Sequence, residues 1–549
     1  MRSEPELFKR YVSRRSALKV GAVSLLASQA ALLDRLAVHP VRRALASAPS
    51  NVSDIQFDIG NFVHPAQTFN DGAGNVVADF GVTFALFLPA TLTRTPTRSD
   101  QTVLANALAA IENNFAFSPS GAFVHVHYGL PYFSRLPAAL TRAVQGKGIP
   151  RLLIDRKRLA LEEAVPSPTD VVGGFVGGPN AIIPNVKKQR FNVNVVIEQN
   201  DVLFQFKSDS SSNVQNIANW LQGSNNLNGS FVFSPNFNGL FQFQTQRLQF
   251  VQPGLPRKVA DNAAMTNFFA NEFHARINPD SSMTMGFVDQ QTDSTGPAQI
   301  VTFVGNSSAQ FTDADAGDYF DNGSIAHFSH DIEDLFQFYE TPQQDPAGVG
   351  EPFTERVQYM FRSNQLGTTN GIPTAGNTDQ FQNGGGAAFI NNVFQGANAA
   401  ERGARDSAGT FTSSNATLDA TFTGKPRIGH EVALQRSSRA ADGTPVHIRN
   451  DGPGFDGMDV PQFQDFPGSP NAVTFPAGTS QFKLQFLVFV PTAEFFRAMR
   501  ANQAAQDLQS DFNVDGDDNG VERFITATRR QNFLTPPRRN RAFPLVEFS

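Results

Sequence analysis

The sequence predicts an α+β fold in which antiparallel sheets pack against helices. Segments that alternate apolar and polar residues recur along the chain, and such alternation is typical of antiparallel strands with one buried face. Segments with apolar residues three and four positions apart lie between them, which indicates helices. A hydrophobic content of 40% and a charged content of 17% are those of a globular protein. Together these observations favour sheets that are backed by helices.

The first half of the chain contains four segments with strand-like alternation and two with helical spacing. Strands are predicted at residues 80–90, 121–130, 190–206 and 239–250. Helices are predicted at residues 100–115 and 210–223. In the first helix, the apolar side that would face a sheet consists of Val103, Leu104, Leu108 and Ile111.

The second half repeats this succession of helices and strands. Residues 331–340 have helical spacing, residues 481–490 have the clearest strand pattern, and residues 492–509 have a helix pattern directly after it. Residues 367–420 are rich in Gly, Asn, Thr and Ala, and are predicted to be a long polar insertion. A chain of 549 residues fits two domains, or one large domain with insertions, and we predict two, over residues 48–280 and 281–549.

The first 47 residues have the features of an export signal. A twin arginine, Arg14 and Arg15, precedes an apolar run from Val20 to Leu33 that is too short to span a bilayer. We therefore predict a twin-arginine signal over residues 1–47 that is removed on export, with an uncleaved amphipathic anchor as the alternative. The signal would place the protein in the periplasm, in the cell envelope or outside the cell, with no stable membrane span.

The net charge argues against nucleic-acid binding, and the composition excludes disulfides and thiolate metal sites. Removing the 9 basic and 3 acidic residues of the predicted leader changes the net charge from −6 to −12. Such an acidic surface repels phosphate backbones, so nucleic acid is not an expected partner. The chain contains no Cys, which excludes disulfides and thiolate metal sites.

Two pairs of histidines occur at short spacing. His125 and His127 lie on one face of a predicted strand and could hold a metal, but no third ligand is near them in the sequence. We therefore predict that they are a structural pair. His327 and His330 come just before a predicted helix, where helix capping or solvent exposure is the expected role.

Three elements in the second half occur in an order that points to one enzyme family. Residues 286–289 are Gly-Phe-Val-Asp, residues 429–430 are Gly-His, and Arg449 follows nineteen positions after the histidine. In this order they resemble the Gly-x-x-Asp-Gly segment, the proximal histidine and the distal arginine of the dye-decolourising peroxidase (DyP-type) superfamily. The strand pattern at 481–490 and the ending "NFLTPPRRNRAFP" resemble a divergent exported branch of that superfamily. The resemblance covers most of residues 280–549.

The resemblance implies a haem peroxidase made of two ferredoxin-like domains, with the haem pocket mainly in the C-terminal half. His430 would bind the iron of haem b from the proximal side. Asp289 would relay a proton between the oxygens of hydrogen peroxide, while Arg449 would contact the haem and stabilise the departing hydroxide. The second substrate would be a small organic reductant, dye-like or phenolic, oxidised at the haem edge or through a surface aromatic residue. Trp220 and the six Tyr are the candidates for that second route, although packing explains them as well.

One departure from the family pattern favours a different function. The motif ends in glycine where this chain has Gln290, and a side chain there would crowd a cofactor. The alternatives are a non-catalytic exported protein of the same fold that has lost haem, and a protein that handles haem or iron without turnover. Without the resemblance, His430 is explained as a buried structural imidazole, and the arginines of residues 427–451 as the polar surface of a loop. The sequence leaves the oligomeric state open, a homo-oligomer included.

A calcium site is a separate prediction from the C-terminal region. Residues 511–522 fit the calcium-loop pattern D-x-[DN]-x-[DN]-G-x5-E. The loop has Asp518 at its eighth position, where an apolar residue normally pairs with a second loop, and the sequence shows no second loop. A polar turn is therefore the alternative to a structural Ca²⁺ site. The candidate ligands are Asp511, Asn513, Asp515, Asp517 and Glu522.

Overall fold

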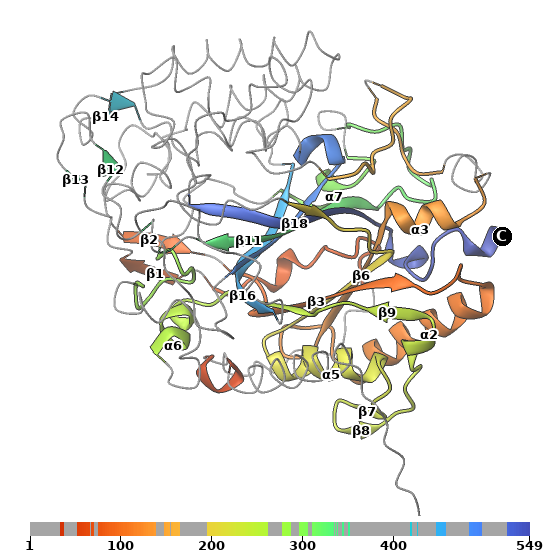
Figure 1. Ribbon diagram of the computed structural model, residues 1–549, viewed down its shortest axis with the longest axis horizontal. Coiled ribbons are helices and arrows are strands. Elements are labelled where there is room, and N and C mark those ends of the chain that lie inside the picture. The colour runs from red at the N-terminus through yellow and green to blue at the C-terminus, as the bar shows by residue number, and fades with distance from the viewer. Residues whose placement is uncertain are drawn as a thin grey trace, which may run out of the picture.

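The computed structural model describes residues 33–37, 52–65, 67–70, 75–78, 80–138, 148–153, 155–164, 195–261, 277–286, 296–305, 310–333, 335, 338, 343–344, 350–351, 418–419, 425–426, 446–456, 483–496 and 524–549. Within these ranges the chain forms a closed antiparallel sheet with helices on its outer side (Figure 1). The α+β class predicted from the sequence is therefore confirmed. No helix in these ranges is long and apolar enough to cross a membrane.

The closed sheet consists of eight strands, each antiparallel to both of its neighbours. Around the sheet they follow in the order β10 (Arg247–Phe250), β16 (Ile448–Asp456), β17 (Lys483–Val490), β11 (Ser324–Glu333), β18 (Ile525–Thr535), β4 (Phe123–Gly129), β6 (Val202–Ser208) and β3 (Phe84–Leu92). β3 pairs with β10 and so completes the circle. Two short strands extend the sheet: β9 (Phe241–Phe243) pairs with β3, and β5 (Val196–Ile197) lies parallel to β18.

The strand order is the same in the two halves of the chain. In the first half the order across the sheet is β4, β6, β3, β10, which is the second, third, first and fourth strand along the sequence. In the second half it is β16, β17, β11, β18, which is again second, third, first and fourth. The last strand of each half pairs with the second strand of the other, as Leu248 with Phe455 and Phe533 with Gly129 show. The predicted boundary between residues 280 and 281 falls between these two strand sets and stays a prediction.

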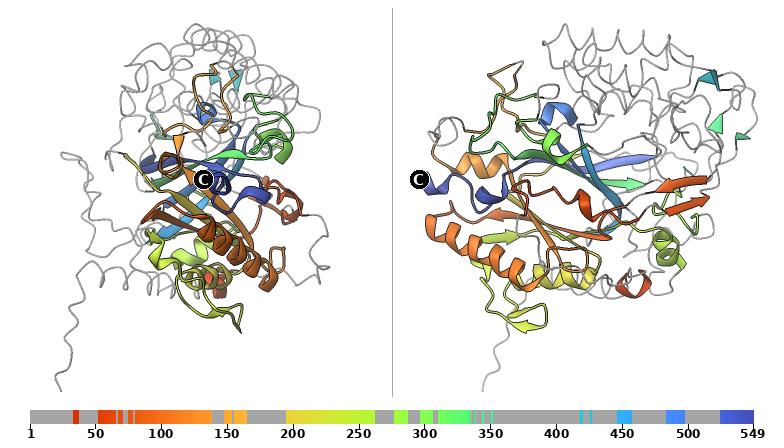
Figure 2. Two further views of the ribbon diagram at one scale, coloured as in Figure 1. Left: turned by 90° about the vertical axis from the view of Figure 1, so that its right-hand side faces the viewer. Right: turned by 180° about the vertical axis from the view of Figure 1, so that it is seen from behind.

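Two helices cover the outer face of the first-half strands (Figures 1 and 2). α2 (Arg98–Asn114) follows β3 and begins with a capping box, in which Thr97 and Asp100 each bond the other's backbone N–H. Its buried side consists of Leu104, Ala107, Leu108 and Ile111, whereas Val103, which was predicted on that side, is exposed. α5 (Ser211–Leu221) follows β6 and buries Val214, Ile217 and Trp220. Helix α2 and helix α5 thus match the predicted helices to within a few residues.

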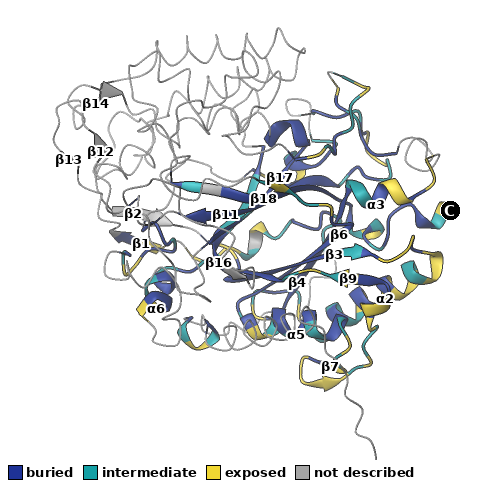
Figure 3. Cartoon of the chain, viewed as in Figure 1, coloured by how far each residue is buried: buried dark blue, intermediate teal, exposed yellow. Residues whose placement is uncertain are grey.

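Alternation along the strands separates two hydrophobic cores. On β3, Phe84, Leu86 and Leu88 belong to the larger core outside the sheet, whereas Ala85 and Phe87 belong to a smaller core inside it. The inner core also contains Phe328 of β11, Leu487 and Phe489 of β17, and Phe533 of β18, so it joins both halves. Figure 3 shows that the strands are buried almost throughout.

The remaining elements are short. The helices among them are α3 (Leu130–Arg135), α6 (Leu255–Asp261) and α7 (Ala298–Val301), with 3₁₀ turns η1 (Gly60–Phe62), η2 (Phe237–Gly239), η8 (Arg538–Asn540) and η9 (Val546–Phe548). Two-stranded pairs are formed by β1 (Gln67–Asn70) with β2 (Asn75–Ala78), β7 (Asn226–Leu227) with β8 (Ser230–Phe231), β12 (Gln343–Gln344) with β13 (Gly350–Glu351), and β14 (Leu418–Asp419) with β15 (Lys425–Pro426).

The prediction of a helix at residues 331–340 placed the beginning of the helix too early in the sequence. Residues 331–333 are the end of β11, and Leu335 and Phe338 are the first described residues in helical geometry. The pairing of β11 with both β17 and β18 extends the strand past the point where the helical spacing starts. Most of the predicted insertion 367–420 and of the predicted helix 492–509 lies outside the described residues, although residues 493–496 are helical.

Candidate functional site

The structure places one of the three predicted haem-site residues. Arg449 lies on β16, opposite Val488 of β17. Asp289 and His430 lie outside the described residues, and so do Gln290 and the predicted calcium loop 511–522.

Arg449 belongs to a row of side chains that crosses four strands. Val488, its partner on β17, is paired in turn with His327 of β11, and His327 is paired with Asn532 of β18. Directly opposite residues of an antiparallel pair point to the same face. Because Val488 belongs to the outer core, this face is the outer one. We call it the Arg449 face and define it by two rows: Arg449, Val488, His327 and Asn532, then Asp451, Phe486, Ser329 and Arg530.

His327 is buried at the centre of the Arg449 face. Its Nδ1 atom lies 2.7 Å from Oδ1 of Asn532 and its Nε2 atom lies 2.7 Å from Oγ of Ser329. The ring stacks on Phe496, with 3.3 Å between the centroids and 15° between the planes. His330 is also buried, with its Nδ1 atom next to the hydroxyl of Thr528. The prediction that both histidines cap a helix or face solvent is therefore wrong, because β11 runs through the middle of the second-half strands.

A buried carboxyl group lies further along the same face. Glu333 at the end of β11 is fully enclosed, and burial raises its pKa to about 7. The hydroxyl of Thr284 donates to this carboxyl group and opposes the shift, whereas the nearby charges of Asp331 and Asp451 add to it. A carboxyl group with a pKa near neutrality can accept and release protons at the pH of most enzymes. No local sequence pattern indicates Glu333, because its partner is 49 residues away in the sequence.

The contact between Thr284 and Glu333 fixes the chain that leads to the predicted motif. Thr284 is five residues before Asp289, and Gly286 is the last described residue of that segment. Gly286 has φ of 82°, in the left-handed region that favours glycine. This backbone conformation explains why the first position of the Gly-Phe-Val-Asp motif is a glycine.

Residues from the first half close over the other side of the Arg449 face. The guanidinium group of Arg158 binds the carboxylates of Glu162 and Glu494, the second of which is buried. Asn532 donates from Nδ2 to the carbonyl of Glu162 over 2.9 Å. Arg530 lies over the ring of Phe496, 5.9 Å from its centroid. This part of the face is thus packed by protein.

The predicted structural pair His125 and His127 lies inside the closed sheet. Nδ1 of His125 is 2.8 Å from Oε1 of Gln205, and Nδ1 of His127 is 2.7 Å from Oγ1 of Thr535. Burial lowers the pKa of His127 to about 3, and holds the pKa of His125 well below its usual value with help from the charge of Lys207. Both rings are neutral at ordinary pH. The described residues contain no group of three or more His, Cys, Asp or Glu arranged to hold a metal ion.

One interior side chain connects the first half to the strand that carries Arg449. Lys207 of β6 donates from Nζ to Oδ1 of Asn450 over 2.6 Å. Asn450 is next to Arg449 on β16, and strand alternation turns their side chains to opposite faces. Burial lowers the pKa of Lys207 to about 8.

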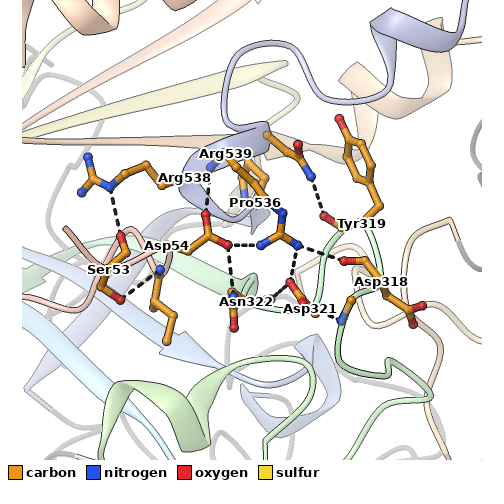
Figure 4. A network of polar contacts seen from close by, with 12 residues as sticks. Ser53, Asp54, Asp318, Tyr319, Asp321, Asn322, Pro536, Arg538 and Arg539 are labelled. Carbon is orange, nitrogen blue, oxygen red and sulfur yellow. Dashed lines mark hydrogen bonds and ion pairs between the residues drawn. The ribbon is translucent and has the colours of Figure 1, made fainter. Parts of the chain in front are cut away.

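The basic C-terminal tail is held by acidic neighbours (Figure 4). Arg539 binds the carboxylates of Asp54 and Asp321, and donates to the carbonyl of Asp318 over 3.0 Å. Arg538 donates to the carbonyl of Ser53, forms an ion pair of 2.5 Å with Glu112 and lies over the ring of Phe117. The residues just after the predicted leader are therefore joined to the end of the chain.

One family of unknown function matches part of the chain, and no curated protein matches it. A family described as of unknown function, DUF7405, matches residues 181–385, less than half of the chain. No match was found among the curated proteins.

Solved structures are similar to this chain over most of its length. A putative DyP-type peroxidase from Shewanella oneidensis has 12% identity and a TM-score of 0.42, and covers 86% of this chain and 96% of its own. A dye-decolorizing peroxidase from Bacteroides thetaiotaomicron has 12% identity and a TM-score of 0.41, with 84% and 95% covered. A DypB variant from Rhodococcus jostii in complex with haem has 12% identity and a TM-score of 0.38, with 84% and 94% covered. The chain is thus similar to DyP-type peroxidases at low identity.

Proposed function

We propose that this protein is an exported haem peroxidase of the DyP type, which reduces hydrogen peroxide and oxidises a small organic donor, dye-like or phenolic. The order of the Gly-Phe-Val-Asp motif, His430 and Arg449 in the sequence supports the proposal. The succession β3, α2, β4, β6, α5, β10 in the first half is that of a ferredoxin-like unit, and the second half has the same strand order. This arrangement supports two ferredoxin-like domains, with boundaries at residues 48–280 and 281–549.

One observation carries the proposal. Arg449 and Glu333 lie on the same outer face of the second-half strands, and Thr284 donates to Glu333 from the segment that leads to Asp289. Two elements that are about 160 residues apart in the sequence therefore approach the same face. A distal carboxylate and a distal arginine of one peroxide site need such an approach.

The residues of the Arg449 face fit the distal side of a haem in part. A guanidinium group is always charged and suits the stabilisation of a departing oxyanion. His430, which follows Gly429, would bind the iron. Haem, when bound, would supply the redox chemistry that amino-acid side chains lack. The stacked rings of His327 and Phe496 already fill the middle of the face.

The proposed roles divide the handling of protons and charge. The carboxylate of Asp289 would take the proton from one peroxide oxygen and return it to the other. The N–H groups of Arg449 would donate to the oxygen that leaves as hydroxide or water. Glu333, with its pKa near neutrality, would be a second group on this face that can accept and release a proton.

A second candidate is a non-catalytic exported protein of this fold that has lost haem. Gln290, in place of the motif glycine, and the packing of Phe496 against His327 both favour it. Calcium at residues 511–522 would stabilise such a protein. A third candidate handles haem or iron without turnover.

Absorption spectra and a dye assay separate these candidates. The full chain, produced with haem supplied, should show a Soret band that is lost in His430→Ala and retained in His274→Ala, a histidine without an assigned role. Peroxide-dependent oxidation of an anthraquinone dye should fall at least about 100-fold in Arg449→Leu and stay unchanged in Arg257→Leu on the surface of α6. A Soret band without dye oxidation would favour haem handling. The absence of a Soret band would favour the non-catalytic protein.

A further inference from the structure

A short piece of the predicted export leader is packed against the folded body. Residues 33–37 form one helical turn, in which the backbone N–H of Ala37 donates to the carbonyl of Leu33 over 2.9 Å. Leu33 is 0% exposed and Ala37 is 9% exposed, and both belong to the outer hydrophobic core. Arg35, on the other side of the turn, is exposed. In Figures 1 and 2 this turn is the red segment close to α5.

Asp34 of this turn binds the beginning of α5. Its carboxylate accepts hydrogen bonds from the backbone N–H of Ser211 over 2.6 Å and of Ser212 over 2.9 Å. The hydroxyl of Ser210 donates to the same carboxylate over 3.1 Å. Ser210 also serves as the N-cap of the helix, because its hydroxyl oxygen accepts from the N–H of Asn213.

These contacts satisfy the groups that a helix leaves open at its first turn. The first N–H groups of a helix have no partner within the helix, and the helix dipole favours a negative charge beside them. Ser210 supplies a partner for Asn213, and Asp34 supplies partners for Ser211 and Ser212. The carboxylate comes from 176 residues earlier in the chain and arrives together with a buried leucine. An apolar contact and a charged contact thus select the same segment.

We propose that residues 33–37 are a docking element through which the leader binds the folded body at the N-terminus of α5. The binding site for residues 33–37 exists only when α5 has formed and packed on β3 and β6. The leader can therefore dock only on a folded chain. The contact itself is independent of haem and of peroxidase activity; its meaning for export rests on the prediction that residues 1–47 are a leader. Once the leader is removed, this binding site at the N-terminus of α5 is left without the leucine and the carboxylate that residues 33–37 supply.

Thiol bridging in the full chain tests the docking. The natural sequence contains no Cys, so two introduced cysteines are the only thiols. Leu33 still packs into the core when Asp34 is replaced, so Asp34→Cys combined with Ser212→Cys, an exposed residue of α5, should be bridged faster than the control pair by a short thiol-bridging reagent. The control, Arg35→Cys with Ser212→Cys, differs by one position and faces away, and it should be bridged many times more slowly. Equal rates for the two pairs, or equal rates before and after unfolding in urea, would overturn the proposal.

Hydrogen exchange provides an independent test that leaves the cysteines out. In the unmodified full chain, the amides of Ser211 and Ser212 should be protected, and Asp34→Ala should remove that protection while the amides of Val214 to Leu221 stay protected. Arg35→Ala should leave the pattern unchanged. Unaltered protection in Asp34→Ala would refute the docking. Because the Soret band and dye oxidation should be the same in all these variants, failure of this proposal is distinguishable from failure of the proposed function.

Discussion

The ammonium group of Lys207 donates a hydrogen bond to the side-chain carbonyl of Asn450 across the interior of the closed sheet, over 2.6 Å. One residue belongs to the first half of the chain and the other lies beside Arg449 in the second half. The buried cation therefore fixes the strand that carries the predicted distal arginine. It does so in an interior that it shares with the neutral ring of His125.

Replacing Lys207 with Met should remove a pH dependence of stability above pH 8. Burial lowers the pKa of Lys207 from 10.5 to about 8. Between these values the unfolded chain still holds a proton that the folded protein has released, so the free energy of unfolding rises with pH. The rise relative to Lys207→Met should reach roughly 3 kcal/mol. Urea unfolding at pH 7.5 and pH 10 measures it, with Lys258→Met on the surface of α6 as the control. Parallel pH profiles would contradict the prediction.

Glu333→Gln should remove a pH dependence of the opposite sign. Burial raises the pKa of Glu333 from 4.5 to about 7, so the folded protein keeps a proton that the unfolded chain loses in this window. The stability that the neutral acid contributes is fully present below pH 4.5 and is lost as pH rises through 7. From pH 4.5 to 8, the natural protein should lose up to about 3 kcal/mol relative to Glu333→Gln. Denaturant unfolding across this range is the measurement, and the exposed Glu163→Gln should follow the natural protein.

Arg539→Met should loosen the chain that follows the predicted leader. The guanidinium group joins the C-terminal tail to Asp54 and Asp321, and both pairs are partly open to solvent. Because such pairs are individually weak, the free energy of unfolding should fall by about 1 kcal/mol. A double-mutant cycle with Asp54→Asn should show coupling between the two sites. Arg257→Met, which breaks a single pair with Asp261 four residues away, should have a smaller effect. Additive effects of Arg539 and Asp54 would contradict the prediction.

Phe328→Ala should destabilise the interior that the two halves share. The ring of Phe328 lies 4.6 Å from that of Phe87, and the guanidinium carbon of Arg247 lies 4.7 Å from its centroid. Removing a buried ring leaves a cavity and costs about 3–5 kcal/mol. In addition, Arg247 would lose the aromatic face that it contacts. Thermal and denaturant unfolding measure the loss, and Phe233→Ala on the exposed end of the β7–β8 segment should change stability little.

The spacing of apolar residues within short segments predicted helix α2 and strand β17. The helical spacing of Leu104, Leu108 and Ile111 predicted the buried side of α2, although Val103, which was assigned to the same side, is exposed. The alternation of residues 481–490 likewise predicted β17 to within two residues. In these cases the signal and the structure depend on neighbours a few positions apart.

Long-range pairing was not predictable in the same way. Ile332 and Leu335 fit a helical pattern, yet pairing with β17 and β18 keeps residues 331–333 in a strand. The pairing of Phe533 with Gly129, which helps to close the sheet, joins residues about 400 positions apart. The raised pKa of Glu333 depends on burial and on distant neighbours, so its sequence context carries no trace of it. For the candidate site, the sequence supplied the three residue types in order, and the structure adds the face on which Arg449 lies.

The ion pair between Asp54 and Arg539 joins the residues that follow the predicted leader to the C-terminal tail. If the predicted leader is removed, a linker from Ser549 to the residues before Asp54 would give a circular permutant with new termini elsewhere. In such a protein the order of synthesis would change while every strand kept its neighbours. The contacts between side chains hold these two segments together whether or not the backbone is continuous between them.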